Sequence, residues 1–209
     1  YSIPHGIWAD LGSGTGLLAE SLEKFNTNQN VIRIDNSPSM IRQQKATTTT
    51  LWDLNRGLPK FPDRPTLLAS SFVLHWLKEP SIRLEEWFSA LAPGGWLALA
   101  VPIQGSFQEW YEASLRAEVN CTAWDLPSQE LLLKSVKKGK IRHNQIITST
   151  ENSNNITSLL KRMVKVGAHT SSKSSLSISQ WRRIQKVWEK SNNDTVALTW
   201  LVQLLLIES

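Results

Sequence analysis

An apolar run that ends in a glycine-rich turn constrains the fold of this chain more than any other feature. Residues 7–16 have the sequence IWADLGSGTG, so glycine occupies every second position at Gly12, Gly14 and Gly16. Glycines directly after a buried strand are typical of a tight turn that brings the backbone close to a ligand. A helical pattern follows at residues 16–25, and its apolar side chains are expected on one face: Leu17, Leu18, Leu22 and Phe25.

Strand-like and helix-like segments alternate through the first hundred residues. Further strands are expected at 31–35 (VIRID), within 65–76 (PTLLASSFVLHW) and at 96–102 (WLALAVP). Helices are expected after Ser37, which is a candidate N-cap followed by Pro38, and at 81–91 (SIRLEEWFSAL). This alternation predicts a doubly wound α/β sheet, a fold that binds ligands at the carboxyl ends of its strands.

The second half of the chain has a looser pattern. Helices are expected at 106–119, 125–140, 155–168 and 179–190, and strands at 145–151 and 195–208. Ser128 is the expected cap of the second of these helices, and Ser177 and Gln180 stand at the spacing of a capping box. No repeat or long linker divides the chain, so we expect one domain with a helical insertion near residues 105–145.

The composition argues against several classes of protein. The single cysteine, Cys121, cannot form a disulfide within the chain, which favours a reducing compartment such as the cytoplasm. The longest apolar stretch, Trp200–Ser209, is too short to cross a membrane, and no signal-peptide pattern is present. No cluster of cysteine and histidine has metal-ligand spacing, so no metal is expected.

The formal charge of +5 is unevenly placed. Residues 1–104 carry nine basic and nine acidic side chains, whereas residues 126–190 carry thirteen basic and three acidic ones. A neutral half followed by a basic half indicates small-molecule chemistry in the first and an acidic partner for the second. A well-solvated basic surface without a partner is the alternative.

The spacing of the glycines indicates which ligand the turn binds. A dinucleotide fingerprint has the pattern G-x-G-x-x-G, whereas this turn is G-x-G-x-G and follows Asp10. A carboxylate at that position repels a pyrophosphate and suits a cationic, amine-bearing ligand. S-adenosylmethionine has a sulfonium, an ammonium and no phosphate. A P-loop is excluded because no Gly-Lys-Ser/Thr follows.

Two further acidic residues fit a nucleoside ligand. Asp35 ends the second strand, about twenty residues past the glycines, where a carboxylate can accept both ribose hydroxyls. Asp53, in the segment LWDLNRGLP, is placed to accept the adenine amino group. Taken singly, either aspartate is equally typical of a helix cap. Together and in this order they favour a nucleoside site.

These segments resemble the successive motifs of class I S-adenosylmethionine-dependent methyltransferases. The resemblance rests on WADLGSGTG, VIRIDNSPSMI, LWDLNRGLP and APGGWLALAVP, and it covers residues 7–102. It implies a doubly wound, seven-stranded, mostly parallel Rossmann-like sheet with an antiparallel last strand. It also implies S-adenosylmethionine as cofactor. The cofactor site assigned in this way comprises Asp10, Gly12, Ser13, Gly14, Gly16, Asp35, Asn36, Met40, Asp53, Leu54 and Ser71.

A narrower resemblance extends over most of the chain. The segments SSFVLHWLKEP, VPIQGSFQEW, LLKRMVKVGAHTSS, LSISQWRRIQKVWEK and ALTWLVQLLLIE are similar to those of the malonyl-acyl-carrier-protein O-methyltransferases of biotin synthesis. This resemblance implies methyl transfer to the free carboxylate of a malonyl thioester on acyl carrier protein. It divides the single domain 1–209 into a cofactor-binding half, 1–104, and a half for the substrate, the carrier protein and the last strands, 105–209. That family also has a helical lid before its first strand, where only Tyr1–Gly6 stand here.

The basic second half fits this partner independently, because acyl carrier proteins are small and acidic. The side chains expected to steer the carrier are Lys134, Lys137, Lys138, Lys140, Arg142, Lys161, Arg162 and Lys165. A nucleic acid could meet the same surface, but no aromatic residues interleave with the lysines and no RNA-binding motif is present. Neither nucleic acid nor membrane is therefore expected as a partner.

A malonyl carboxylate is already ionised at neutral pH, so we expect no essential general base. His75 is interpreted as a hydrogen-bond donor that orients the substrate, with an ordinary polar residue at a helix start as the alternative. Trp76 is expected to exclude water, Gln104 and Ser106 to hydrogen-bond the substrate, and Arg162 to recruit its carboxylate. Trp8, Trp87, Trp96 and Trp188 are assigned to core packing.

Two alternatives to this function stay open. One is a methyltransferase of the same fold that acts on a small molecule such as a quinone precursor or a phenol. Such an enzyme has no use for the basic surface and tends to need a general base. The other is a non-catalytic protein that keeps the nucleoside site but lacks the lid.

Overall fold

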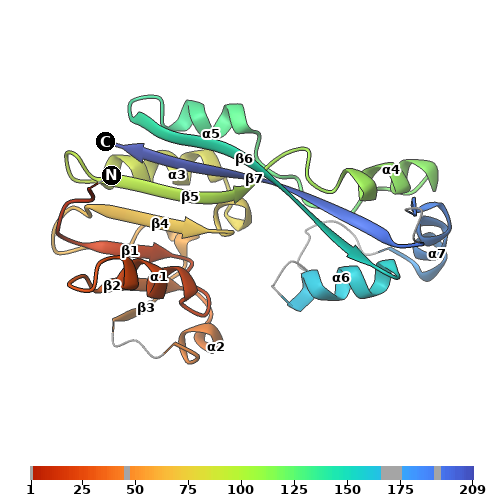
Figure 1. The fold of residues 1–209 in the computed structure, drawn as a ribbon, viewed down its shortest axis with the longest axis horizontal. Coiled ribbons are helices and arrows are strands. Elements are labelled where there is room, and N and C mark those ends of the chain that lie inside the picture. Colours follow the sequence, from red (N-terminus) through yellow and green to blue (C-terminus); the bar gives the residue numbers. More distant parts are fainter. Residues whose placement is uncertain (1, 45–47, 166–175, 191–193) are drawn as a thin grey trace. The chain divides into compact units, whose positions relative to one another are not determined.

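The computed structural model describes residues 2–44, 48–190 except 166–175, and 194–209, with the side chains of 162–165 outside the described part (Figure 1). Seven strands form one sheet in the order β3-β2-β1-β4-β5-β7-β6. Their bounds are β1 Trp8–Leu11, β2 Val31–Asp35, β3 Thr49–Leu51, β4 Leu67–Ser71, β5 Trp96–Pro102, β6 Lys140–Ser153 and β7 Val196–Glu208. The predicted fold class is confirmed.

The first five strands are parallel, and β7 is the strand that runs in the opposite direction (Figure 1). β1 pairs in parallel with β2 and β4, β2 with β3, and β4 with β5. β7 runs antiparallel to β5, since the Ser209 amide donates to the Gly95 carbonyl at 2.9 Å and the Ile103 amide to the Leu201 carbonyl at 2.9 Å. The carboxyl ends of β1 to β4 therefore lie along one edge of the sheet.

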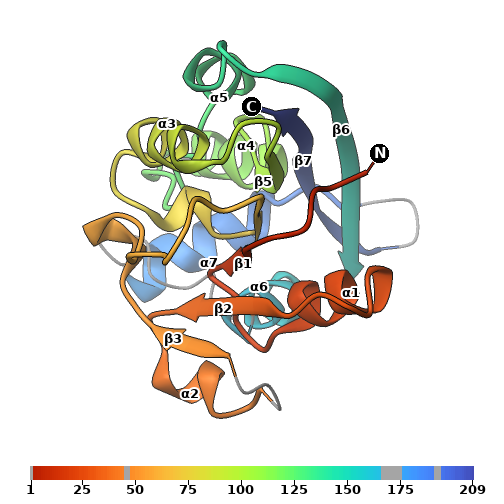
Figure 2. The same ribbon diagram turned by 90° about the vertical axis from the view of Figure 1, so that its left-hand side faces the viewer.

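The helices alternate with the strands in the first half of the chain. Over the whole described part of the chain, the helices are α1 Leu17–Phe25, α2 Pro38–Ile41, α3 Pro80–Ala90, α4 Gln108–Arg116, α5 Gln129–Ser135, α6 Ile156–Lys165 and α7 Ile178–Val187. Two short 3₁₀ turns are η1 Leu54–Arg56 and η2 Leu74–Trp76. Ser37 and Ser128 cap α2 and α5, and Ser177 forms the predicted capping box of α7 with Gln180. Figure 2 shows α1 on one face of the parallel strands and α3 on the other.

The chain forms two compact units. The first unit comprises Tyr1–Pro102, Pro127–Ile146 and Gln203–Ser209, and the second comprises Ile103–Leu126 and Ile147–Val202. The long strands β6 and β7 each contribute residues to both units. Whether the chain acts as the single domain expected from the sequence stays a prediction.

The burial of the tryptophans confirms their packing role, since Trp8, Trp87, Trp96 and Trp188 are at most 4% exposed. The predicted apolar face of α1 is wrong in part. Leu17 and Phe25 are 71% and 70% exposed, whereas Ala19 is fully buried. The small Ala19 side chain lets α1 approach the strands closely, so the buried face is centred on Ala19 with Leu18 and Leu22 beside it.

The sequence also failed to indicate β3. The three residues Thr49–Leu51 continue a run of threonines and pair in parallel with β2, so the strand predicted third along the chain is the fourth. Three residues are too few for a pattern of alternating polarity to be visible. The predicted end of a helix at Gly167 and the polar loop before Ser177 fall largely on residues 166–175, outside the described part.

Candidate functional site

The glycine turn has the backbone geometry that its sequence predicts. Gly12, Gly14 and Gly16 have φ values of 74°, 53° and 90°, which disfavour any residue with a Cβ atom. A Cβ atom at Gly12 would lie 2.2 Å from a methyl group of Val73, so the segment that leads into η2 packs directly on the turn. A Cβ atom at Gly14 would meet no atom within 4 Å, so that face of the turn is open.

The end of β2 anchors the turn through backbone amides. The amides of Gly12 and Ser13 donate to the Ile34 carbonyl at 2.8 and 2.9 Å. The Asp35 carboxylate accepts the Gly14 amide at 2.8 Å and, through its other oxygen, the Ser37 amide at 2.8 Å. Because an ionised carboxylate offers about four acceptor positions, Asp35 keeps capacity for a ligand hydroxyl.

Two other residues assigned to the cofactor follow Asp35. Asn36 is exposed between the end of β2 and α2, and Met40 is half-buried in α2. Asn36 and Met40 therefore lie close in the chain to Asp35, whose carboxylate holds the glycine turn.

Gln44 contacts the turn, although no sequence pattern assigned its segment to the site. Its side-chain amide donates to the Gly14 carbonyl at 2.7 Å and to the Ser13 hydroxyl at 3.0 Å. Its carbonyl oxygen Oε1 is buried and has no hydrogen-bond partner. Gln44 therefore clamps the turn and leaves an acceptor beside it. No sequence signal marks this residue, because it is separated from the turn by about thirty residues.

Asp10 is buried directly behind the turn. It is 1% exposed, and its carboxylate accepts the Ala19 amide of α1 at 3.1 Å. Burial raises the pKa of the Asp10 carboxyl to about 7, although the Ala19 hydrogen bond and the Arg33 charge lower it. Asp10 therefore ties β1 to α1, and a nearby positive charge would favour its ionised form.

The basic residue opposite Asp10 in the sheet already forms an ion pair with another carboxylate. Arg33 lies opposite Asp10 in the β1–β2 ladder and is 4% exposed. Its guanidinium binds the Glu23 carboxylate of α1 at 2.7 and 2.9 Å and donates to the Val31 carbonyl. A pyrophosphate at the turn would therefore find Arg33 neutralised by Glu23, which disfavours a dinucleotide.

Asp53 lies at the end of the neighbouring strand. It caps η1, where its carboxylate accepts the Asn55 amide at 2.9 Å and the Asn55 side chain at 3.0 Å. The Trp52 amide donates to the Asp35 carbonyl at 2.9 Å, which holds this segment beside the end of β2. Leu54 is 4% exposed and packs beneath η1. The two aspartates assigned to the nucleoside thus follow adjacent strands.

The end of β4 carries Ser71, which was assigned to the cofactor, and the segment after it carries the predicted substrate residues His75 and Trp76. Ser71 is exposed at the end of β4, and His75 in η2 is 9% exposed. The Trp76 ring centroid lies 4.8 Å from that of His75, and its indole nitrogen donates to the Phe72 carbonyl at 3.0 Å. Burial lowers the pKa of the His75 imidazole to about 4, and its Nδ1 atom has no hydrogen-bond partner. His75 is therefore neutral at physiological pH.

The other predicted substrate residues belong to the second unit. Gln104 and Ser106 line one cavity there, but Ser106 is 2% exposed and bonded to the Ile103 carbonyl and the Leu201 amide. Ser106 thus holds the backbone in place, a role that the sequence did not predict. Arg162 lies in α6, and its side chain is outside the described part.

Metal-ion clusters and membrane-spanning helices were sought among the residues that the structure describes. There, no three histidine, cysteine, aspartate or glutamate side chains are grouped to hold a metal ion. No helix within these residues is long and apolar enough to span a bilayer.

S-adenosylmethionine fits the residues around the turn. The open face over Gly14, the carboxylates of Asp35 and Asp53, and the buried Asp10 provide acceptors and negative charge, as a cationic nucleoside requires. The fold is the Rossmann-like sheet of methyltransferases, and the acceptors around the turn suit a cationic nucleoside.

Comparison with known proteins supports a methyltransferase domain in the first half of the chain and the methyltransferase fold for the whole of it. Residues 9–99 match the family described as a methyltransferase domain. The YcgJ protein from Bacillus subtilis has a similar structure, with a TM-score of 0.62, 12% identity and coverage of 96% of this chain and 90% of that protein. An S-adenosylmethionine-dependent methyltransferase from Mesorhizobium loti gives a TM-score of 0.51, 15% identity and coverages of 95% and 90%.

The relatives with higher sequence identity are trans-aconitate 2-methyltransferases. The protein from Mycobacterium tuberculosis is 34% identical over 110 residues, which are 52% of this chain and 41% of that protein. The protein from Mycobacterium marinum is 32% identical over 110 residues, 52% of this chain and 40% of that protein. The chain thus spans less than half the length of these relatives. Their names differ from the malonyl-carrier methyltransferases expected from the sequence, so that finer assignment stays a prediction.

Proposed function

We propose that this protein transfers a methyl group from S-adenosylmethionine to the free carboxylate of a malonyl thioester on acyl carrier protein. The observation that supports a carboxylate acceptor is the state of His75. A buried imidazole with a pKa of about 4 is a poor general base at neutral pH. A carboxylate needs no base, because it is already ionised, whereas a phenol must lose a proton.

The contribution of the chain is then to bind and orient. When bound, S-adenosylmethionine supplies an electrophilic methyl group on a sulfonium. Asp35 and Asp53 accept hydrogen bonds from the nucleoside, and the ionised form of Asp10 favours a cation at the turn. Orientation and the exclusion of water can together lower a barrier by roughly 7–11 kcal/mol, which suffices without acid–base catalysis.

His75 and Trp76 form the wall next to the turn. The neutral imidazole has one nitrogen that donates and one that accepts, and Nδ1 is buried without a partner. Because Nδ1 is buried out of reach of a ligand, the proposed donor is Nε2, which donates to one oxygen of the acceptor carboxylate. The Trp76 ring, 4.8 Å away, keeps water from this contact.

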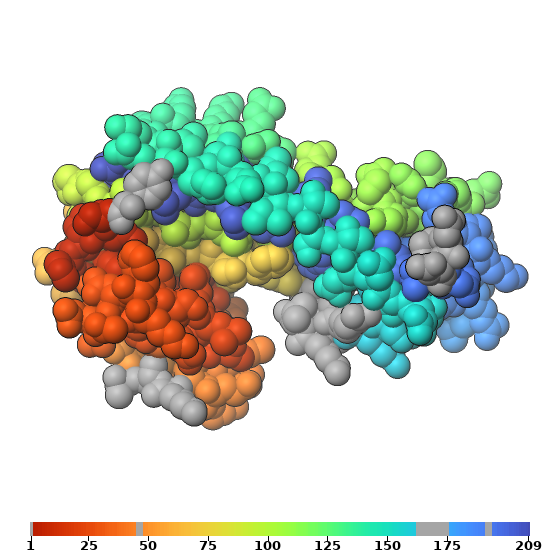
Figure 3. Space-filling model, in the orientation of Figure 1, coloured from red at the N-terminus to blue at the C-terminus, as the bar shows by residue number. Residues whose placement is uncertain are grey.

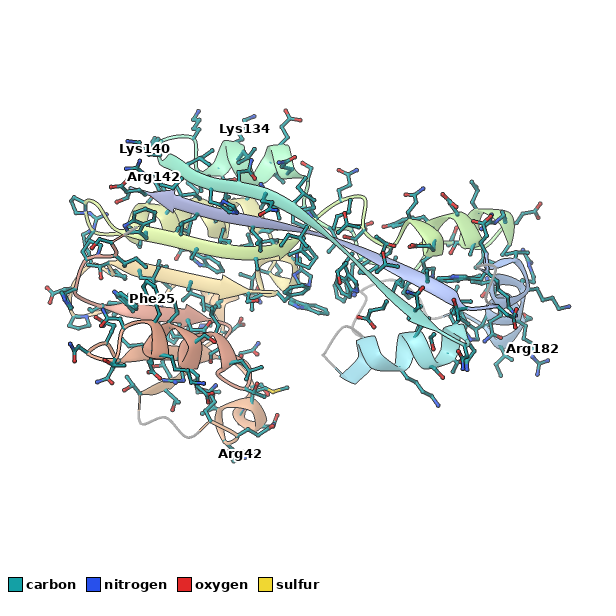
Figure 4. All side chains as sticks on the ribbon, in the orientation of Figure 1. Phe25, Arg42, Lys134, Lys140, Arg142 and Arg182 are labelled. Atoms are coloured by element: carbon teal, nitrogen blue, oxygen red, sulfur yellow. The ribbon has the colours of Figure 1, made fainter. Side chains whose placement is uncertain are left out.

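Exposed lysines at the end of α5 support an acidic carrier as partner. Lys134, Lys137, Lys138 and Lys140 are all exposed and belong to the first unit, and we name them the α5–β6 basic cluster. Figure 4 shows Lys134 and Lys140 at the end of α5 and the start of β6, with Arg142 beside Lys140. Arg142 is paired with Glu208, so it adds less to the attraction of a partner.

The rest of the basic surface expected from the sequence belongs to the second unit. Lys161 is exposed in α6, and the side chains of Arg162 and Lys165 lie outside the described part. The carrier is therefore proposed to meet the α5–β6 basic cluster, where long-range attraction raises the rate of encounter.

A free tricarboxylate is the second candidate acceptor. It is supported by the 34% identity to a trans-aconitate 2-methyltransferase. This acceptor shares the chemistry of the first, because it is also an ionised carboxylate that needs no general base.

The test is incubation with methyl-labelled S-adenosylmethionine and one acceptor at a time. The acceptors are malonyl-acyl carrier protein, malonyl-coenzyme A, free malonate and trans-aconitate. We expect label in malonyl-acyl carrier protein, bound as an ester that mild base releases. Label in trans-aconitate alone would establish the second candidate, and label in none of them would reject carboxyl methylation.

A further inference from the structure

A cavity of about 500 Å³ lies within the second unit, a size typical of small-molecule sites. The turn after β5, the first turns of α4 and the segment before α5 form its walls. The described residues that line it are Gln104, Gly105, Ser106, Gln108, Tyr111, Trp124, Asp125 and Leu126.

The walls of this cavity are fixed by hydrogen bonds. The Ser106 hydroxyl donates to the Ile103 carbonyl at 2.8 Å and accepts the Leu201 amide of β7 at 2.9 Å. The Tyr111 hydroxyl donates to the Trp124 carbonyl at 3.0 Å, which joins α4 to the opposite wall. The cavity is therefore formed before any ligand binds, which lowers the entropic cost of binding.

The chemistry of the lining is polar but nearly uncharged. Gln104 and Gln108 present carboxamides, and Tyr111 and Trp124 present aromatic rings. Among the described lining residues Asp125 has the only formal charge, and it is negative. Carboxamides both donate and accept, so they suit an amide-bearing chain, and aromatic rings pack against its methylene groups.

We infer that this cavity binds the uncharged, amide-bearing arm through which a carrier protein holds its acyl group as a thioester. The inference rests on the proposed function and deepens it, because it assigns a site in the second unit to the arm of the proposed substrate. It also separates the two candidate acceptors, since a free tricarboxylate has no such arm.

The probe is pantetheine, which is the arm without carrier protein or acyl group. Wild-type protein should bind pantetheine in a calorimetric titration, and Gln104→Trp, which fills the cavity from an exposed position, should weaken binding at least tenfold. Gln108→Trp, on α4, should do the same. Gln145→Trp is the matched control, because Gln145 is exposed on β6 in the first unit and should leave binding unchanged. Absence of binding to the wild type, or equal binding by all variants, would overturn the inference.

Methyl transfer separates this inference from the proposed function. We expect both cavity variants to raise KM for malonyl-pantetheine about tenfold. Methylation of malonyl-acyl carrier protein with an unchanged KM in both variants would reject the cavity and keep the function. Loss of pantetheine binding in the variants, together with no methylation of any carboxylate by the wild type, would reject the function and keep the cavity.

Discussion

Asp10 and His75 are buried ionisable residues whose pKa values burial shifts in opposite directions. The carboxyl of Asp10 is raised to about 7 and the imidazole of His75 is lowered to about 4, because burial disfavours the charged form of each. Both shifts favour neutral side chains in the protein without ligand. A cationic ligand at the turn reverses this preference for Asp10 but gives no reason to protonate His75.

Asp10→Asn tests the cost of the buried carboxylate. In the folded wild type the pKa of Asp10 lies above the ordinary 3.8. The protonated carboxyl therefore contributes its full stabilisation below about pH 4, and this contribution is lost as the pH rises through 7. We expect Asp10→Asn to raise the free energy of unfolding at pH 8 by up to about 4 kcal/mol, with little effect at pH 4. Asparagine can still accept the Ala19 amide. Urea unfolding at both pH values measures this, and an equal effect at both would contradict the account.

His75→Gln tests the absence of a general base. Because the buried imidazole is neutral and weakly basic, we expect kcat at pH 7.5 to fall less than about tenfold. A general base contributes roughly 10²- to 10⁴-fold, so a loss in that range would show that His75 removes a proton.

The same variant has an expected effect on acid stability. His75 has a folded pKa below its ordinary 6.5, so its stabilising neutral state is complete above 6.5 and is lost as pH falls to about 4. As the pH falls through this range, the free energy of unfolding of the wild type should decrease by up to about 3 kcal/mol more than that of His75→Gln. Unfolding curves of both proteins at pH 7 and pH 4 give the difference.

Gln44→Leu tests the clamp on the glycine turn. Removal of its bonds to Ser13 and Gly14 should weaken S-adenosylmethionine binding by about 1 kcal/mol, or roughly fivefold. Gln43→Leu is the matched control, because Gln43 is exposed and bonds only within its own turn to Ser39 and Met40. Equal affinities of the two variants, measured by calorimetry, would show that the clamp has no role.

At the scale of elements, local patterns predicted the parallel half of the sheet well. β5 is a continuous apolar run, and β1 and β2 are mostly apolar strands that contain Asp10 and Arg33. Serine caps marked the starts of α2, α5 and α7. β3 was not predicted because three residues carry too little pattern. Exposure of Leu17 and Phe25 was not predicted because the centre of a buried face depends on which residue meets the strand.

The candidate site shows the same division. The glycine turn and Asp35 could be predicted because their residue types follow directly from backbone geometry and strand ends. Gln44 and Ser106 could not, because their roles depend on contacts with residues distant in the chain. The burial of His75 that sets its pKa is likewise a property of packing and not of the sequence FVLHW.

The α5–β6 basic cluster gives a prediction at this scale. The double variant Lys137→Glu, Lys138→Glu should raise KM for malonyl-acyl carrier protein about tenfold, because it reverses the field that attracts an acidic partner. KM for malonyl-pantetheine, which carries no acidic protein, should not change. Lys60→Glu, a charge reversal at an exposed lysine elsewhere in the first unit, is the control. The attraction should weaken as salt is added. If neither the double variant nor added salt changes KM for malonyl-acyl carrier protein, this surface is not part of the carrier interface.

For the whole molecule, the two units do not coincide with the halves 1–104 and 105–209 assigned from the sequence, because residues 127–146 and 203–209 belong to the first unit. All the residues assigned to the cofactor belong to the first unit, whereas the cavity belongs to the second. Cofactor variants should therefore change the affinity for S-adenosylmethionine, and cavity variants should change the affinity for the acceptor arm.

The central claim is that the glycine turn and its aspartates bind a cationic nucleoside without phosphate. Calorimetric titration of the whole chain with S-adenosylmethionine, and separately with NAD and ATP, tests it most directly. The account predicts that wild-type protein binds S-adenosylmethionine, that Asp35→Ala weakens this binding at least tenfold, and that neither phosphate-bearing nucleotide competes. Tighter binding of NAD or ATP, or no change of affinity in Asp35→Ala, would contradict it.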